Sequence, residues 1–181
     1  MKQMLKLGLI LAAYTAVACV CLALVNNVTS PTIAALKQAQ LEEGLKVVFA
    51  DADSFSVPEG FSSSVIDGVT IEDVYIAKKG DAVIGAIAKA TGPTYDKATL
   101  LVGVNRDKKV EAISFLSITD TPGFGQKATE PVFYNQYAGK AITDEFATKK
   151  DITPISGATI TTNGVSAIVK IAANAAATYL Q

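Results

Sequence analysis

The pattern of hydrophobic positions divides the chain into an apolar beginning, a strand-like middle and a helical end. From Leu7 to Val25, nineteen residues follow one another without a charge. A helix rises about 1.5 Å per residue, so this run reaches about 28 Å, close to the roughly 30 Å hydrocarbon core of a bilayer. The pattern predicts a single transmembrane helix within residues 1–26 and one globular domain over residues 27–181.

The middle of the chain alternates between hydrophobic and polar positions, which is typical of strands. Four such stretches occur between residues 69 and 118, and they read "VTIEDVYIAKKG", "DAVIGAIAKAT", "TLLVGVNRD" and "KVEAISFLSI". Short turns rich in Gly, Pro, Asn and charged residues separate them, and such turns join antiparallel neighbours. We therefore expect an antiparallel sheet of four strands, which is an ordinary size.

Helical segments are expected on both sides of these strands. Ser30 and Pro31 suit the cap and the first position of a helix that runs to about residue 49. Residues 50–68 are rich in Asp, Ser, Gly and Pro and predict an irregular connection. A short helix is expected over residues 132–138 and a longer one over residues 162–180. The predicted fold class is α+β, with an antiparallel sheet flanked by helices behind one transmembrane helix.

The charges around the apolar run predict its orientation. Lys2 and Lys6 precede the run, and the next charged residue is Lys37. The positive-inside rule therefore places the N-terminus in the cytoplasm and residues 27–181 on the other side of the membrane. A cleaved signal peptide is the alternative, because "AVAC" around Cys19 resembles a cleavage site. Apolar residues continue beyond Cys19, which favours a retained anchor.

Composition excludes several classes of site from the domain. The chain has no histidine, and both of its cysteines, Cys19 and Cys21, lie inside the apolar run. A zinc centre, a cysteine nucleophile and a histidine-based triad are therefore excluded beyond residue 26. Fourteen of the sixteen basic residues follow the run and face seventeen acidic ones, so this part has a formal charge of −3. That balance argues against an electrostatic nucleic-acid binder.

Two short segments carry the candidate chemistry. The first is "ITDTPGFG" (residues 118–125), in which Phe124 lies between two glycines and either packs into the core or faces a planar ligand. The second is "SGAT" (residues 156–159), which opens the last helix. Helix N-termini collect free N–H groups and a partial positive charge, which suits a phosphate. The hydroxyls of Thr159, Thr161 and Thr162 either bind such a ligand or only cap the helix.

Together with the apolar N-terminal run that leads into "LALVNNVTSPTIA", these two motifs resemble those of the FMN-binding subunits of two related membrane complexes. They are the G subunit of the Rnf ferredoxin:NAD oxidoreductase and the C subunit of the sodium-translocating NADH:quinone oxidoreductase. The compact length is more similar to that of the Rnf protein. In this family, FMN is joined through a phosphoester to the threonine of the "SGAT" motif by a separate flavin transferase, and Thr159 is the matching residue here.

The resemblance implies a set of cofactor-binding residues from both motifs, and it implies no catalytic residue and no metal ligand. The set consists of Thr159 as the covalent attachment site, Ser156, Gly157, Ala158, Thr161, Asp120, Thr121, Pro122, Gly123, Phe124 and Gly125. Asp120 and Phe124 stand where the family has Glu and Leu. The family often has Asp three residues before the Ser of the motif, where this chain has Thr153, and Asp151 lies two residues further back.

The function implied by the resemblance is that of a non-autonomous electron carrier. Its cofactor would be covalent FMN, and its partners would be the other membrane and peripheral subunits of an Rnf-type complex, the flavin transferase and the lipid bilayer. Two alternatives remain open, a stand-alone membrane-tethered flavoprotein reductase and a non-redox membrane adaptor. The aromatic residues Phe133, Tyr134 and Tyr137 either pack the short helix or contact the flavin or a partner protein.

Overall fold

The computed structural model describes residues 2–180, which divide into two compact units between Gln40 and Leu41. The first unit belongs to α1 (Lys2–Val48), a helix that includes the whole apolar run. Among the described residues, α1 is the one helix long and apolar enough to cross a bilayer, and the hydrophobic side chains of its first half are exposed. The predicted boundary at residue 26, between the membrane-spanning segment and the globular domain, stays a prediction.

The predicted helix start at Ser30 and Pro31 is wrong, because α1 continues through both residues. A proline within a helix removes one N–H donor, but its fixed φ is helical and the chain can continue at a cost. Next to Pro31, the hydroxyl of Thr29 donates a hydrogen bond of 2.9 Å to the carbonyl of Val25, one turn earlier in the same helix. Ser30 and Pro31 therefore lie inside α1 and do not cap a helix.

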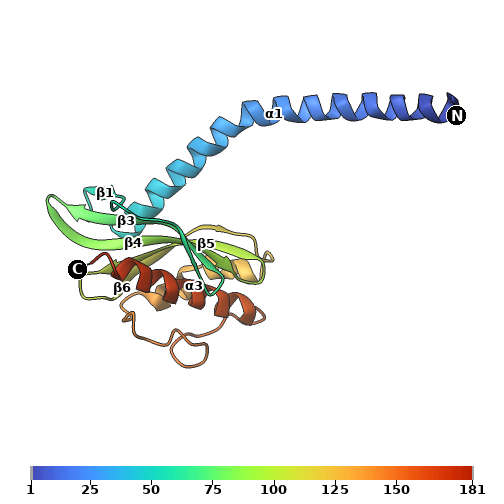
Figure 1. Cartoon of the computed structure of the whole chain (residues 1–181). Coiled ribbons are helices and arrows are strands. Elements are labelled where there is room, and N and C mark those ends of the chain that lie inside the picture. Colours follow the sequence, from blue (N-terminus) through green and yellow to red (C-terminus); the bar gives the residue numbers. More distant parts are fainter. Residues whose placement is uncertain (1, 181) are drawn as a thin grey trace. The chain divides into compact units, whose positions relative to one another are not determined.

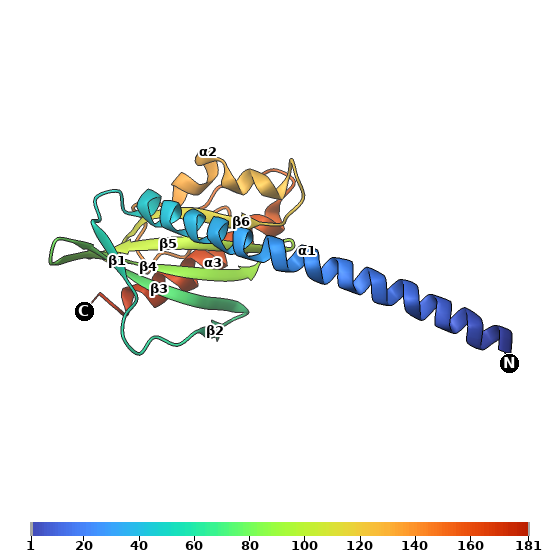
Figure 2. The same ribbon diagram turned by 90° about the horizontal axis from the view of Figure 1, so that it is seen from above.

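The second unit is built on an antiparallel sheet with the strand order β1-β3-β4-β5-β6 (Figures 1 and 2). Its long strands are β3 (Val69–Lys79), β4 (Ala82–Pro93), β5 (Lys97–Asn105) and β6 (Val110–Ile118). These four match the four predicted stretches, so the α+β class and the antiparallel arrangement are confirmed. The predicted irregular connection is corrected in part, because the short strands β1 (Ser54–Ser56) and β2 (Ser64–Ile66) pair with β3.

Helix α3 (Thr159–Ala177) covers one face of the sheet, as Figure 1 shows. Its buried positions recur every three or four residues, and they meet strand positions occupied by small side chains such as Ala86, Ala88 and Ala90. Gly164 extends this close packing to the β4–β5 turn, because a Cβ there would lie 2.5 Å from the carbonyl oxygen of Pro93. The first turns of α3 are thus held against that turn.

The opposite face of the sheet receives the last residues of α1 and Phe49. Leu45, Val48 and Phe49 pack on Ile87 and Leu101. The ring of Phe49 fills a hollow over two glycines of β4 and β5, since a Cβ on Gly85 would lie 2.1 Å from it. The core of the unit therefore has two layers of side chains, one on each side of the sheet.

The remaining elements connect β6 to α3. They are η1 (Gly125–Thr129), α2 (Pro131–Tyr134) and η2 (Asn135–Tyr137), and the last two replace the single short helix expected over residues 132–138. Helix α3 begins three residues before its predicted start, at Thr159. The earlier start brings the end of the "SGAT" motif into the first turn of the helix.

Candidate functional site

A pocket forms where three segments that are distant in the sequence meet. Tyr95 comes from the β4–β5 turn, Thr121, Phe124 and Gly125 come from the loop after β6, and residues 157–161 come from the start of α3. The cavity has a volume of about 470 Å³, within the range of about 300–1,000 Å³ that small-molecule sites occupy. The structure thus brings the "TPGFG" and "SGAT" motifs, about thirty residues apart in the sequence, onto facing walls of one pocket.

The helical wall of the pocket presents unpaired backbone donors. The N-cap of α3 is Ala158, and no side chain caps the helix. Within residues 2–180, the N–H groups of Thr159, Ile160 and Thr161 have no hydrogen-bond partner. The exposed hydroxyl of Thr159 has no partner in this part of the chain either. A helix N-terminus with free N–H groups favours an anion such as a phosphate, which would lie beside the Thr159 hydroxyl.

The hydroxyls of the next threonines are used within the protein. Thr162 is buried, donates to the carbonyl of Ala158 at 3.0 Å and accepts from the N–H of Ile155 at 3.1 Å. Thr161 is also buried and donates to the carboxylate of Asp120 at 2.5 Å. Of the three threonine hydroxyls, that of Thr159 is therefore the one available to a ligand.

Phe124 supplies a planar apolar surface to the pocket. Its side chain is 56% exposed, so it does not pack into the core. The ring lies against the backbone of Gly157, where a Cβ would approach Cδ1 of Phe124 to 3.3 Å. Gly157 has φ +78°, a backbone conformation that glycine adopts without strain. The two motifs therefore touch each other at this point.

Asp120 lies beneath the pocket, fully buried, and accepts four hydrogen bonds. Its Oδ1 accepts from the Thr94 hydroxyl at 2.5 Å and from the N–H of Asp96 at 2.9 Å. Its Oδ2 accepts from the Thr161 hydroxyl at 2.5 Å and from the N–H of Tyr95 at 3.2 Å. Burial is the largest influence and raises the pKa of Asp120, but the four donors together outweigh it and lower the pKa below its ordinary value.

Apart from the buried Asp120, the predicted site residues fall into two groups, those that line the pocket and those that do not. Those that line the pocket are Thr121, Phe124, Gly125, Gly157, Ala158, Thr159 and Thr161. Asp120 lies below it, while Pro122, Gly123 and Ser156 belong to the same two segments but do not line the cavity. Gly125 packs so closely on Asp120 that a Cβ at position 125 would lie 2.5 Å from the Cβ of Asp120.

Two lining residues were not predicted from the sequence. Tyr95 is 66% exposed and Ile160 is 61% exposed, and both border the pocket with large apolar surfaces. Tyr95 lies in the segment "TGPTYD", residues 91–96, at the end of β4 and in the turn that follows it. Its position in a turn after a long strand was the available signal, but only the fold shows that this turn faces α3.

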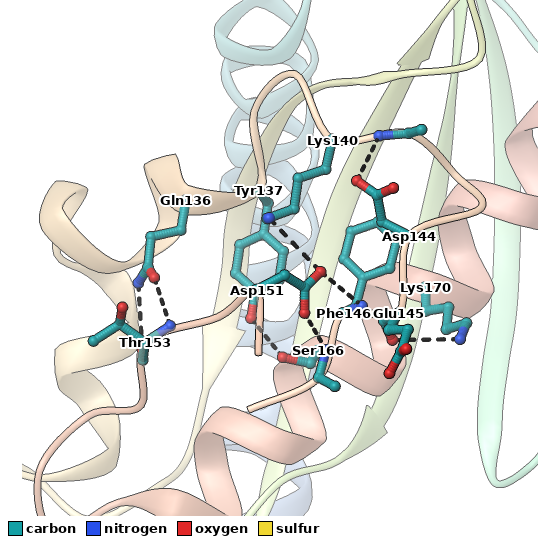
Figure 3. Close-up of polar contacts among 12 residues, drawn as sticks. Gln136, Tyr137, Lys140, Asp144, Glu145, Phe146, Asp151, Thr153, Ser166 and Lys170 are labelled. Carbon is teal, nitrogen blue, oxygen red and sulfur yellow. Dashed lines mark hydrogen bonds and ion pairs between the residues drawn. The ribbon is translucent and has the colours of Figure 1, made fainter. Parts of the chain in front are cut away.

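The aromatic residues after the loop belong to the core. Phe133 and Tyr137 are buried, and the Tyr137 ring stacks on Phe146 with centroids 6.2 Å apart. The Tyr137 hydroxyl pairs with that of Ser166 on α3 at 2.8 Å (Figure 3). Burial first, and then the nearby charge of Asp151, raise the pKa of Tyr137 to about 12. These side chains therefore pack the short helices, as one of the two interpretations expected.

Asp151 does not take the place of the Asp that the family often has three residues before the Ser of the "SGAT" motif. Its carboxylate accepts from the N–H groups of Phe146 and Ala147, at 3.0 and 2.6 Å, and pairs with Lys140 at 3.7 Å (Figure 3). Thr153, the residue at the usual Asp position, is held through its backbone by the side-chain amide of Gln136. Asp151 therefore stabilises the loop before the site and is engaged away from the pocket.

Comparison with known proteins agrees with this geometry. A family model described as an FMN-binding domain matches residues 95–174, and one described as the RnfG N-terminal region matches residues 1–48. The G subunit of the Na⁺-translocating ferredoxin:NAD⁺ oxidoreductase complex of Acetobacterium woodii is 32% identical, over 94% of this chain and 90% of that protein. The G subunit of the proton-translocating ferredoxin:NAD⁺ oxidoreductase complex of Clostridium ljungdahlii is 33% identical, over 87% and 83%.

A more distant relative extends the same pattern. The G subunit of the ion-translocating oxidoreductase complex of Yersinia pestis is 31% identical, over 96% of this chain and 90% of that protein. The FMN-binding match begins at Tyr95 and includes every residue that lines the pocket. The region common to the family therefore contains the whole candidate site.

Proposed function

The chain belongs to the family of Rnf complex G subunits, and on this premise we propose that it is a membrane-anchored electron carrier with FMN esterified to Thr159. The observation that carries the attachment site is the free hydroxyl of Thr159 in the first turn of α3, beside unpaired N–H groups. Bound FMN would supply the redox chemistry, and the protein would position it and tune its potential.

The pocket has the groups that FMN requires. The three free N–H groups at the start of α3 suit the phosphate, and they lie on the same turn as the Thr159 hydroxyl. Phe124, Tyr95 and Ile160 provide apolar surface for a planar ring. The cofactor would lie between the two motifs, with its phosphate at the helix and its ring toward Phe124.

The protein itself offers no activation for the Thr159 hydroxyl. A threonine hydroxyl is a weak nucleophile without an adjacent base, and no side chain of residues 2–180 hydrogen-bonds to this one. The chain also has no histidine. A separate flavin transferase would supply the activation, which is consistent with an exposed attachment residue.

The anchor would hold this domain beside its partner proteins. The apolar run of α1 and its preceding lysines support a single-pass arrangement, with the N-terminus in the cytoplasm and the FMN domain on the outer face of the inner membrane. The relatives in A. woodii and C. ljungdahlii are named as subunits of a Na⁺-translocating and a proton-translocating complex. We propose that this chain relays electrons within a complex of that kind.

Expression of the full-length chain with and without a flavin transferase tests the proposal. After denaturing electrophoresis, flavin fluorescence should remain with the chain only when the transferase is present, and Thr159→Ala should abolish it. Thr143→Ala is the matched control, because Thr143 is exposed and lies outside the pocket. A chain that stays colourless with an active transferase would favour the non-redox adaptor, and fluorescence retained in Thr159→Ala would exclude this attachment site.

A further inference from the structure

We propose that Asp120 is a positioning residue that fixes the three walls of the pocket before any cofactor is attached. The proposal rests on the proposed function for the identity of the ligand, but the arrangement it describes belongs to the chain alone. The sequence resemblance suggested a ligand contact for Asp120. Its burial and its four hydrogen bonds assign it a different role.

The carboxylate joins segments that are far apart in the sequence. Thr94, Tyr95 and Asp96 lie 24 to 26 residues before Asp120, and Thr161 lies 41 residues after it. An ionised carboxylate has about four acceptor positions, two on each oxygen. Here each oxygen accepts two hydrogen bonds from the protein, so no acceptor position is left for a ligand.

Each segment joined by Asp120 also carries a residue that lines the pocket. The backbone N–H of Tyr95 is itself a donor to the carboxylate, and the Tyr95 side chain borders the cavity. Thr161 lies two residues after Thr159 in the same turn of α3. Gly125, next to Phe124, packs directly on Asp120. Movement of the carboxylate would therefore change the relative positions of Tyr95, Phe124 and Thr159.

An amide cannot replace this carboxylate, although it has nearly the same shape. In Asp120→Asn, the NH₂ group must occupy the position of either Oδ1 or Oδ2. At Oδ1 it would face the N–H of Asp96, and at Oδ2 it would face the N–H of Tyr95. A hydroxyl can rotate to accept, but a backbone N–H cannot, so either orientation leaves two donors opposed. The cluster therefore requires an ionised acid.

Segment-resolved amide hydrogen exchange on the full-length, flavin-free chain in detergent tests the proposal. In Asp120→Asn, exchange should rise on the order of tenfold at the hydrogen-bonded amides of segments 94–96, 121–126 and 158–162, such as those of Tyr95, Phe124 and Thr162, and the centre of the sheet should stay protected. Asp151→Asn is the matched control, since Asp151 is also a carboxylate that accepts backbone N–H groups. Its effect should be confined to the loop around residues 146–152.

Two further variants separate positioning from a general loss of stability. Thr161→Val removes one donor and keeps the charge, so it should raise exchange at the hydrogen-bonded amide of Thr162 and leave the 94–96 turn protected. Asp120→Glu keeps the acid and should retain more protection than Asp120→Asn in all three segments. If Asp120→Asn does not fold, Thr161→Val alone still tests the link between Asp120 and α3.

Three outcomes would overturn the proposal. Unchanged exchange in both Asp120→Asn and Thr161→Val would show that Asp120 does not hold these segments. Uniform loss of protection across the domain in Asp120→Asn would make Asp120 an ordinary core residue. Equal effects of Asp151→Asn on the pocket segments would show that the effect is not specific to Asp120. Because all these measurements use the flavin-free chain, they stand apart from whether Thr159 carries FMN.

Discussion

Gly125→Ala tests whether the close contact beneath the pocket has the energetic weight that the structure gives it. An added Cβ would lie 2.5 Å from the Cβ of Asp120, and 2.8 Å from both Oδ2 of Asp120 and the hydroxyl oxygen of Thr161. Distances below 3.0 Å are essentially never observed for a Cβ, so the loop or the Asp120 cluster must shift. Neither neighbour is the end of a long flexible side chain that could move away at low cost.

The expected cost combines strain with a weakened hydrogen bond. Overpacking a well-filled site costs about 1–3 kcal/mol. Displacement of Asp120 would also weaken its charge-assisted hydrogen bond with Thr161. Such a bond contributes about 1.5–3 kcal/mol, and part of this stabilisation would be lost. A total loss of about 2–4 kcal/mol corresponds to a fall in Tm of about 6–12 °C for a domain of this size.

Gly123→Ala is the control from the same loop. Gly123 has φ +77°, and no atom lies within 4 Å of the position that a Cβ would take, so alanine there meets only backbone strain of about 1–2 kcal/mol. Thermal unfolding of both full-length variants in detergent, followed by circular dichroism, makes the comparison. If Gly125→Ala melts within about 2 °C of wild type, a difference smaller than 1 kcal/mol, the steric reasoning is refuted.

Three further predictions concern the surrounding side chains. The pKa values of Asp120 and Asp151 are lowered, so the stability that their ionised carboxylates give to the fold should be complete above their ordinary pKa of 3.8 and be lost as the pH falls below it. In thermal melts between about pH 6 and pH 3, the Tm of Asp120→Asn should therefore fall by less than the Tm of wild type. Tyr137→Phe removes the hydrogen bond to Ser166 and should cost about 1 kcal/mol in thermal unfolding, with flavin attachment unchanged. Phe124→Ala should change stability by less than about 1 kcal/mol, because the ring is exposed, but should make attached flavin more accessible to iodide quenching.

The sheet was predictable because its signal is local. Alternating hydrophobic positions define a strand wherever one face is buried, and each of the four stretches corresponds to one strand within a few residues. The continuity of α1 through Ser30 and Pro31 was not predictable, because these two residues form a good local cap and the outcome depends on the helix that precedes them. The short strands β1 and β2 also depend on a partner, since both exist through pairing with β3.

The candidate site was predictable in its motifs and not in the roles of its members. The sequence indicated that "TPGFG" and "SGAT" contain ligand-binding chemistry, but it offered no physical reason for them to meet. Asp120 could not be distinguished from an exposed acid, because its four donors come from distant segments. Tyr95 was missed for the same reason, since only the packing of α3 on the β4–β5 turn brings it to the pocket.

The central claim is that Thr159 carries FMN, and the intact mass of the chain purified from its native membranes tests it most directly. Fragmentation of the same sample locates any added group. We expect one FMN per chain, joined through its phosphate to Thr159, and a chain without this addition in Thr159→Ala. A bare wild-type chain from flavin-replete membranes, or an addition on another residue, would contradict the claim.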